Sequence, residues 1–319
     1  MIDTKKHKDR HKTNKNMGIE RFFNSLTQIK KITNGIVIGI KEKIFSNFVY
    51  VDFNSVVHNI SSETEKDLNY LLYSILLFQR HPAENPLDQN TLTIIEKYKY
   101  YDNDILKQFD ISNGITLENF LNVFSKDVID QIILTRIKEQ IIHITTNLID
   151  PDNVKQIYIA FDGVPQMSKM IEQKKRRYNG YVIGELKTKI YNESMVNING
   201  TMVHCFDVNS SNNISIRREF EQFKICIDRG RITTRASLMD KIKNMLESNE
   251  FKNELYVGHK ILEQIIISDT EYCGEGEKKI MENIIELGQS CSGTYTIYSP
   301  DADVVILSLI CLNRLDEQS

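Results

Sequence analysis

Long apolar runs are missing from this sequence. No stretch approaches the ~18–20 consecutive apolar residues of a membrane-spanning helix. The N-terminus also lacks the apolar core of a signal peptide. These absences exclude a membrane-embedded or secreted protein, so we expect an intracellular, cytoplasmic protein that makes no membrane contact.

Cysteine is scarce, with five residues in a chain of 319. None of them forms a CxxC pair, and no histidines lie beside them at zinc-like spacing. This distribution argues against a disulfide framework or a zinc site and favours free thiols in a reducing compartment. The cysteines are Cys205, Cys226, Cys273, Cys291 and Cys311.

A large excess of charge of one sign is also absent, because the formal net charge is −3. This value excludes a protein that coats polyanions over its whole surface, so any nucleic-acid contact must come from a local patch. Hydrophobic residues at 41% and charged residues at 26% are typical of a soluble globular protein. The length suits one large α/β domain or two smaller ones.

The first sixteen residues differ from the rest of the chain. Residues 1–16 are basic, polar and almost free of apolar side chains, which predicts a disordered leader. Such a leader suits contact with nucleic acid or a targeting role, and an inert solvated leader suits the pattern equally well. We expect residues 17–319 to form one domain, with a helical insertion around 60–150.

Short apolar and β-branched runs alternate with helical patterns along the chain. Runs at 48–51, 157–161, 202–206, 264–267 and 294–298 are predicted strands. The charged segment 214–246 is predicted to be helical. The alternation is typical of an α/β fold with a mainly parallel central sheet flanked by helices.

Acidic residues occur where these strands are predicted to end. Ligands of parallel sheets bind beyond the carboxyl ends of the strands, so we expect the acids to converge on one edge of the sheet. Such a concentration of negative charge repels itself unless cations bind. The acids are Asp52, Asp162, Asp301 and Asp303, with Glu275 and Glu277 on a glycine-containing turn.

Carboxylate oxygens in this number suit Mg²⁺ or Mn²⁺. Two such ions are the usual device for in-line phosphodiester cleavage, and no organic cofactor is indicated. Each position also has a simpler interpretation, since a strand-end aspartate often caps a helix and acids are favourable in the first turn of a helix. Asp207 and Asp269 fit the same pattern, and we expect neither to belong to the set.

A basic helix is predicted from about residue 166, close behind Asp162. Three cations and an amide lie within an arc of roughly 100° on one of its faces, whereas Lys174 and Lys175 point elsewhere. This face suits a phosphate group held beside a metal, and the alternative is a solvated charge run. The face consists of Lys169, Gln173, Arg176 and Arg177.

With these motifs in hand, the chain resembles the N-terminal conserved region of the XRN family of 5′→3′ exoribonucleases, which carry a PIN/FEN-like nuclease fold. The resemblance extends over most of the chain and rests on five motifs in the family's order. They are MGIERFF (17–23), YVDFNSVVHNISS (50–62), IAFDGVPQMSKMIEQKKRR (159–177), GEGEKKIMENI (274–284) and YSPDADVVIL (298–307).

The resemblance implies a role for each residue singled out above. The six acids would be metal ligands, the basic face would select a 5′-monophosphate, and His58 would stack on the first nucleotide. Family members carry a further metal-binding aspartate, a tryptophan that pairs with the stacking histidine and a second conserved region downstream. Here tryptophan is absent and the sequence ends at Ser319. Ile171 and Glu172 replace polar, uncharged residues, and we expect Glu172 to weaken phosphate binding.

Three hypotheses follow. The leading one is a divalent-metal-dependent 5′→3′ exoribonuclease that degrades 5′-monophosphorylated single-stranded RNA by two-metal hydrolysis. The second is a FEN-like, structure-specific DNA nuclease that uses the same carboxylates. The third is a non-catalytic nucleic-acid-binding fragment with an incomplete metal site. Protein partners are unknown from the sequence.

Overall fold

The computed structural model describes residues 42–80, 87–100, 116–164, 167–193, 195–198, 201–204, 213–232, 236–288, 291–301 and 303–316. The leader (1–16), the motif at 17–23 and Asp207 lie outside these ranges. None of the helices within them is long and apolar enough to span a membrane.

A four-stranded parallel sheet forms the centre of the protein, with the strand order β5-β2-β1-β6. The two central strands are buried along their whole length, whereas the edge strands are partly exposed. The predicted α/β fold with a parallel central sheet is confirmed. The strands are β1 (Phe48–Asp52), β2 (Gln156–Ala160), β5 (Gln264–Ser268) and β6 (Tyr295–Tyr298).

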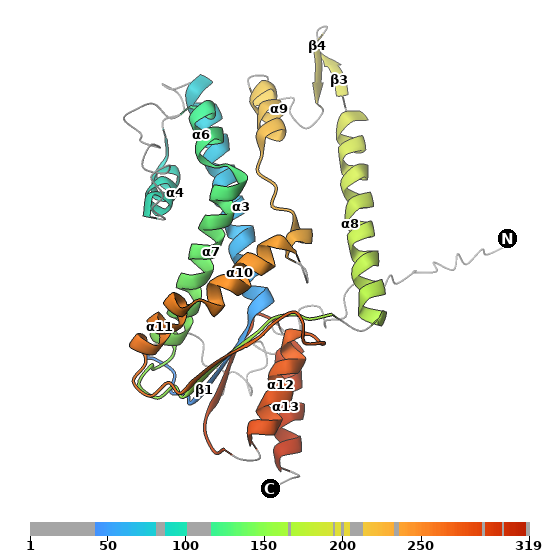
Figure 1. Ribbon diagram of the computed structural model, residues 1–319. Coiled ribbons are helices and arrows are strands. Elements are labelled where there is room, and N and C mark those ends of the chain that lie inside the picture. The colour runs from blue at the N-terminus through green and yellow to red at the C-terminus, as the bar shows by residue number, and fades with distance from the viewer. Residues whose placement is uncertain are drawn as a thin grey trace, which may run out of the picture.

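Alternate side chains of the strands point into two separate cores, as the pleat of a sheet requires. Val51 and Ile159 belong to the larger core, whereas Tyr50 and Tyr158 belong to the smaller one. Helices α12 (Gly276–Gly288) and α13 (Asp303–Asp316) cover the smaller core (Figure 1). The larger core is covered chiefly by α3 (Phe53–Arg80), α7 (Lys126–His143) and α10 (Ser237–Glu247).

The remaining elements extend the helical cover of the larger core. They are α4 (Gln89–Tyr100), α6 (Leu117–Val123), the π-helix η2 (Ile144–Leu148), α9 (Asn213–Phe223), the 3-10 turn η3 (Arg229–Arg231) and α11 (Asn249–Gly258). Much of the range 60–150 is therefore helical. That this range is an insertion relative to the family stays a prediction.

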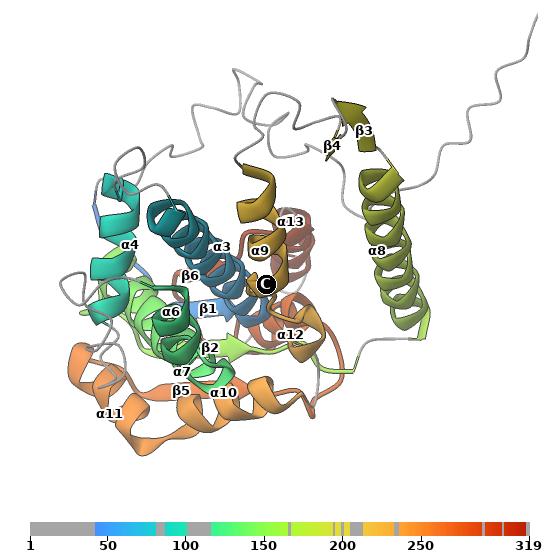
Figure 2. The ribbon, with the colours of Figure 1, turned by 90° about the horizontal axis from the view of Figure 1, so that it is seen from above.

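One long helix, α8 (Met167–Glu193), runs apart from the rest of the protein in both views (Figures 1 and 2). It follows β2 after a short connection and begins near the carboxyl ends of the strands. The predicted basic helix is therefore present, and its first turns border the site described below.

The structure refines two sequence predictions. The run at 202–206 is a strand over its described part, β4 (Thr201–His204), but β4 pairs antiparallel with β3 (Met195–Ile198) in a separate hairpin and does not join the main sheet. The segment 214–246 is not one helix, because α9 ends at Phe223 and α10 begins at Ser237. A local turn intervenes, in which the N–H of Gly230 donates to Asp228 Oδ1 (2.8 Å).

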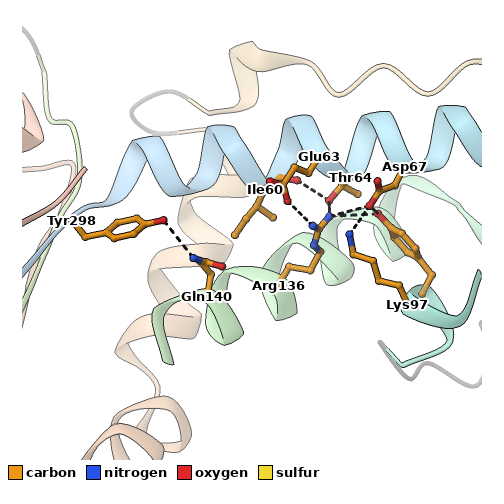
Figure 3. Close-up of polar contacts among 9 residues, drawn as sticks. Ile60, Glu63, Thr64, Asp67, Lys97, Arg136, Gln140 and Tyr298 are labelled. Carbon is orange, nitrogen blue, oxygen red and sulfur yellow. Dashed lines mark hydrogen bonds and ion pairs between the residues drawn. The ribbon is translucent and has the colours of Figure 1, made fainter. Parts of the chain in front are cut away.

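A buried arginine joins the helices of the larger core. Arg136 on α7 is only 7% exposed, and it reaches α3 through Thr64 Oγ1 (2.6 Å) and Glu63 Oε2 (2.9 Å) (Figure 3). It also donates to the Tyr98 hydroxyl of α4 at 3.4 Å. Asp67 accepts from Lys97 beside it (2.6 Å). This network fixes the register of three helices.

We expect Arg136→Met to lower the free energy of unfolding by about 1–3 kcal/mol, because buried polar partners on α3 and α4 lose their donor. Arg80→Met is the matched control, since Arg80 forms an exposed ion pair with Glu219 and its loss should cost less than about 1 kcal/mol. Urea unfolding of both variants measures the difference, and equal costs would contradict the structural role of Arg136.

Candidate active site

A cleft of about 540 Å³ opens beyond the carboxyl ends of the strands. It brings together most of the residues singled out from the sequence, although these come from segments far apart in the chain. Asn54, Ser55 and Pro300 complete its lining. The predicted residues that line it are Asp52, Asp162, Glu275, Glu277, Asp301, His58, Lys169, Gln173 and Arg176.

Asp162 lies just beyond β2 and is held by contacts from two other segments. Asn54 Nδ2 donates to Asp162 Oδ2 (3.0 Å), and the Asp162 N–H donates to Asn54 Oδ1 (3.2 Å). The N–H of Gly276, the first residue of α12, donates to Asp162 Oδ1 (2.8 Å). The carboxylate therefore faces the positive end of the α12 dipole, which fixes its position.

Ser299 links the acid at the end of β1 with those that follow β6. Its hydroxyl donates to Asp52 Oδ2 (2.7 Å) and accepts from the N–H of Asp301 (3.1 Å). Asp301 Oδ1 in turn accepts from the N–H of Asp303 (3.0 Å), the first residue of α13. Asp301 thus caps this helix and also lines the cleft. Asp303 is not among the residues that line it.

Two glycines place the turn with the glutamates against Asp162. The N–H of Gly163 donates to the carbonyl of Gly274 (2.8 Å). A Cβ at position 163 would lie 1.7 Å from the Tyr272 carbonyl oxygen, so a larger residue would push the turn away. Gly274 has φ +108°, which favours glycine. As a result, both Glu275 and Glu277 line the cleft.

Burial and neighbouring charges raise the pKa of two of these carboxyls. Burial, followed by the charges of Asp162 and Asp301, raises the pKa of Asp52 to about 6. Burial, followed by Asp301, Glu275 and Asp52, raises the pKa of Glu277 to about 7. Near neutral pH, the site therefore favours either bound protons or a bound cation.

The donor set fits a hard divalent cation in kind, because carboxylate oxygens are the preferred ligands of Mg²⁺ and Mn²⁺. Within the described ranges, no three His, Cys, Asp or Glu side chains are placed to hold a metal ion as they stand. Protein contacts explain this: Asn54 and Gly276 hold Asp162, Ser299 holds Asp52, and Lys169 holds Glu275. Binding an ion therefore requires some of these contacts to be exchanged.

The basic face of α8 forms the opposite wall of the cleft. Lys169 Nζ lies 3.3 Å from Glu275 Oε1, which ties the start of α8 to the acidic wall. Arg176 also lines the cleft, and its guanidinium pairs with Glu172 at 2.7 Å. The glutamate that we expected to weaken phosphate binding thus contacts one of the phosphate-binding candidates directly.

The structure also places the remaining residues that the sequence singled out. Lys174 and Lys175 are exposed and do not line the cleft, as the helical spacing predicts. The side chain of Arg177 lies outside the described part of the structure. His58 is exposed on α3, one turn beyond Asn54, and lines the cleft. Asp269 pairs with Lys243 and does not line the cleft.

Sequence reasoning missed one residue beneath the cleft, Lys279 on α12. This lysine is only 5% exposed, and its ammonium donates to the carbonyls of Phe161 (2.9 Å) and Asp269 (2.7 Å). It therefore clamps the chain where it leaves β2 and β5. Burial lowers the pKa of Lys279, whereas the nearby Asp162 opposes that shift. The sequence did carry a signal for this residue, because the helical spacing places Lys279 on the inward face of an amphipathic helix.

A family model described as XRN 5′-3′ exonuclease N-terminus matches residues 103–315, more than half of the chain. The chain belongs to the XRN family. The XRN match contains Asp162, the basic face of α8, the two glutamates and the aspartates after β6. Asp52 and His58 precede it in the sequence, yet they line the same cleft.

Three individual proteins that resemble this chain share 29–37% of the aligned residues with it. A protein of Acanthamoeba polyphaga mimivirus, named as a candidate 5′-3′ exonuclease, is 37% identical over 82 residues, which is 26% of this chain and 13% of the relative. The 5′-3′ exoribonuclease 2 of Kluyveromyces lactis is 31% identical over 160 residues, or 49% of this chain and 15% of the relative. An uncharacterized mimivirus protein is 29% identical over 165 residues, which cover 50% of this chain and all of the relative. The chain thus spans only a small part of the two relatives with a named activity.

We expect Lys279→Met to lower the free energy of unfolding by about 1–3 kcal/mol, because two buried carbonyls lose their donor. Lys278→Met is the matched control: its side chain is 49% exposed, so its loss should change stability by about 0.5 kcal/mol or less. Urea unfolding compares the two variants. A neutral Lys279→Met would show that the clamp is not needed.

The raised carboxyl pKa values make stability depend on pH. The native pKa values of Asp52 and Glu277, about 6 and 7, exceed their ordinary values of 3.8 and 4.5. Between the ordinary and the native pKa values, the native state therefore binds more protons than the unfolded state. As a result, the free energy of unfolding falls as pH rises through about 4–7. We expect Asp52→Asn, in EDTA, to be about 1–2 kcal/mol more stable than the parent at pH 8 and to lose less stability between pH 5 and 8.

Asp269→Asn is the control for this pH experiment. The ion pair with Lys243 holds the pKa of Asp269 below its ordinary value, although burial opposes this effect. Its loss should therefore destabilise the protein at pH 8. If Asp52→Asn also destabilised the protein at pH 8, the buried and repelled charge of Asp52 would be ruled out as a source of instability.

Proposed function

We propose that this protein is a divalent-metal-dependent 5′→3′ exoribonuclease that acts on single-stranded RNA with a 5′-monophosphate. The observation that carries the proposal is a single cleft with two chemically opposite walls. One wall is acidic, and the other carries Lys169, Gln173 and Arg176. The acidic wall would hold the metal ions that cleave a phosphodiester. The basic wall would bind the terminal phosphate of the strand.

The acidic wall would hold Mg²⁺ or Mn²⁺, two ions in the leading hypothesis. The candidate ligands are Asp52, Asp162, Glu275, Glu277, Asp301 and Asp303. Bound ions would supply an activated water and charge stabilisation for hydrolysis of the phosphodiester. Asn54 and the N–H of Gly276 orient Asp162, while Ser299 orients Asp52. These contacts pre-position the carboxylates and so limit the reorganisation that ion binding requires.

The basic wall would bind the 5′ end of the strand. Lys169 pairs with Glu275 of the acidic wall, so its ammonium would lie between a bound terminal phosphate and the acids. Arg176 offers the planar guanidinium that suits bidentate phosphate binding. Arg177 belongs to the same proposed set from its sequence position. His58 would stack on the first base, a contact that every base can make.

These contacts would make the enzyme selective for the end of the strand and for its backbone. Membership of the XRN family and the likeness to the K. lactis 5′-3′ exoribonuclease 2 support this proposal. Phosphate selectivity rests on α8 alone, so it can be tested separately from cleavage.

One observation favours a second candidate, a nucleic-acid-binding module without turnover. In the described part of the cleft, the carboxylates are engaged by Lys169, Asn54 and Ser299, and no three acids are placed to hold an ion. This candidate predicts RNA binding but no cleavage with any divalent metal. The test is an RNA labelled at its 3′ end, offered with a 5′-monophosphate or a 5′-hydroxyl in Mg²⁺. Stepwise loss from the phosphorylated 5′ end supports the exoribonuclease.

We expect Asp301→Asn to reduce cleavage by at least about 100-fold, because it removes charge from the metal wall. Asparagine keeps an acceptor for the Asp303 N–H, so the cap of α13 is preserved. Time courses on phosphorylated RNA, with flapped DNA alongside, measure this loss and the preferred polymer. Activity equal to that of the parent would sink the mechanism, and faster cleavage of the DNA flap would overturn the choice of RNA.

We expect Arg176→Ala to abolish the preference for a 5′-monophosphate over a 5′-hydroxyl while slow cleavage of both RNAs persists. The reason is that the guanidinium would contact the terminal phosphate and not the scissile one. Lys174→Ala is the matched control, since Lys174 is exposed on the same helix and faces away from the cleft. The ratio of the two cleavage rates is the readout, and an unchanged ratio in Arg176→Ala would remove this residue from the phosphate site.

A further inference from the structure

The ion pair between Lys169 and Glu275 joins the two walls of the cleft. The ammonium of Lys169 lies 3.3 Å from Glu275 Oε1, and both side chains line the cleft. These side chains are only 26% and 16% exposed, so water screens the pair less than it screens a surface ion pair. A metal ion needs the carboxylate, whereas a terminal phosphate needs the ammonium. The pair therefore withholds one group from each of the two ligands.

A second lysine contacts the same glutamate from another direction. Lys278 Nζ lies 3.6 Å from Glu275 Oε2, and the Lys278 side chain is 49% exposed. Lys278 lines a neighbouring pocket of about 420 Å³ and is not among the described residues that line the cleft. It can neutralise Glu275, but it does not share the cleft with the basic face of α8. Lys169 is therefore the cation that connects Glu275 with the phosphate-binding wall.

Arg176 is also paired, but with an acid of its own helix. The guanidinium lies 2.7 Å from Glu172, one helical turn away. Glu172 is not among the residues that line the cleft, and it is not a candidate metal ligand. An ion at the acidic wall would leave this pair in place. Of these two phosphate-binding candidates, Lys169 is therefore the one that a candidate metal ligand holds.

We infer that Glu275 holds Lys169 while no ion is bound at the acidic wall, and that Lys169 passes to the terminal phosphate once that carboxylate engages a divalent ion. The inference rests on the proposed function, because that function brings both ligands to the cleft. Each ligand removes the competitor of the other, so the two strengthen each other's binding. Selection of a 5′-monophosphate is then complete only in the metal-loaded protein, which alone can cleave the strand.

Glu275→Gln tests this coupling without any metal. An ion and a phosphate also attract each other directly, so measurements with metal would mix two effects. Glutamine keeps the size of the side chain but removes the charge that holds Lys169. The backbone carbonyl of residue 275 still accepts from the N–H groups of Lys278 (3.0 Å) and Lys279 (3.2 Å), so the start of α12 keeps its support. The substitution therefore imitates a carboxylate that an ion has engaged.

The readout is the affinity of the full chain for two oligouridine strands that differ only in a 5′-monophosphate or a 5′-hydroxyl, measured by fluorescence anisotropy in EDTA. We expect Glu275→Gln to raise the ratio of the two affinities about fivefold over the parent, at the low end of typical couplings between sites. Lys169→Met alone should change the ratio little, because Glu275 already holds this ammonium. In Glu275→Gln, the further change Lys169→Met should remove the gain.

Two matched controls separate the coupling from a general change of charge. Asp301→Asn removes one charge from the same acidic wall, but the partner of Lys169 there is Glu275. Weaker repulsion should tighten both strands alike in this variant and leave the ratio unchanged. Lys278→Met, added to Glu275→Gln, removes the other cation beside position 275 and should keep the gain.

The outcomes distinguish this inference from the proposed function. A ratio in Glu275→Gln that equals that of the parent, a rise that Asp301→Asn shares, or a gain that survives Lys169→Met overturns the coupling even if phosphorylated RNA is cleaved. Absence of measurable binding to Glu275→Gln overturns it as well, since the released ammonium should add a phosphate contact. A rise that depends on Lys169, in a protein that cleaves no RNA, supports the coupling and refutes the nuclease alone.

Discussion

Repulsion between carboxylates at the strand ends is the constraint on which the rest of this structure depends. A parallel sheet directs the carboxyl ends of its strands to one edge, and here acids follow β1, β2, β5 and β6 at that edge. The fold cannot relieve the repulsion by moving one strand, because β1 and β2 are buried along their whole length. Burial, together with this repulsion, raises the pKa of Asp52 and of Glu277.

Neighbouring groups compensate for this charge in three ways. Backbone and side-chain donors hold individual acids, as Gly276 and Asn54 do for Asp162. A buried lysine, Lys279, places a positive charge beneath the cleft and ties together the ends of two strands. The basic face of α8 contributes from the opposite wall through Lys169. Lys169 therefore both stabilises an acid of the cleft and is a candidate for binding an anionic substrate.

The parallel main sheet could be predicted from sequence because strand, acid and helix recur in a fixed order. In a parallel sheet the strand ends meet at one edge, so the acids were expected there. The convergence of Glu275 and Glu277 could be predicted too, since only a glycine-rich turn lets both face one point. The hairpin β3-β4 could not, because a run such as 202–206 has the same composition in a hairpin as in a central strand. Lys279 was missed because lysine is usually a surface residue, although the helical spacing places it on the inward face of α12. From the sequence, Glu172 was expected only to weaken phosphate binding, whereas the structure shows that it pairs directly with Arg176.

Calorimetric titration with Mn²⁺ at pH 7, in two buffers of different ionisation enthalpy, shows whether the acidic wall binds a metal ion in exchange for protons. The account predicts that the ion binds and that protons are released, because Asp52 and Glu277 must be deprotonated to act as ligands. It also predicts that Asp162→Asn weakens binding by about 10-fold or more. Absence of binding at millimolar Mn²⁺, or binding that releases no protons and is unchanged in Asp162→Asn, would contradict the account.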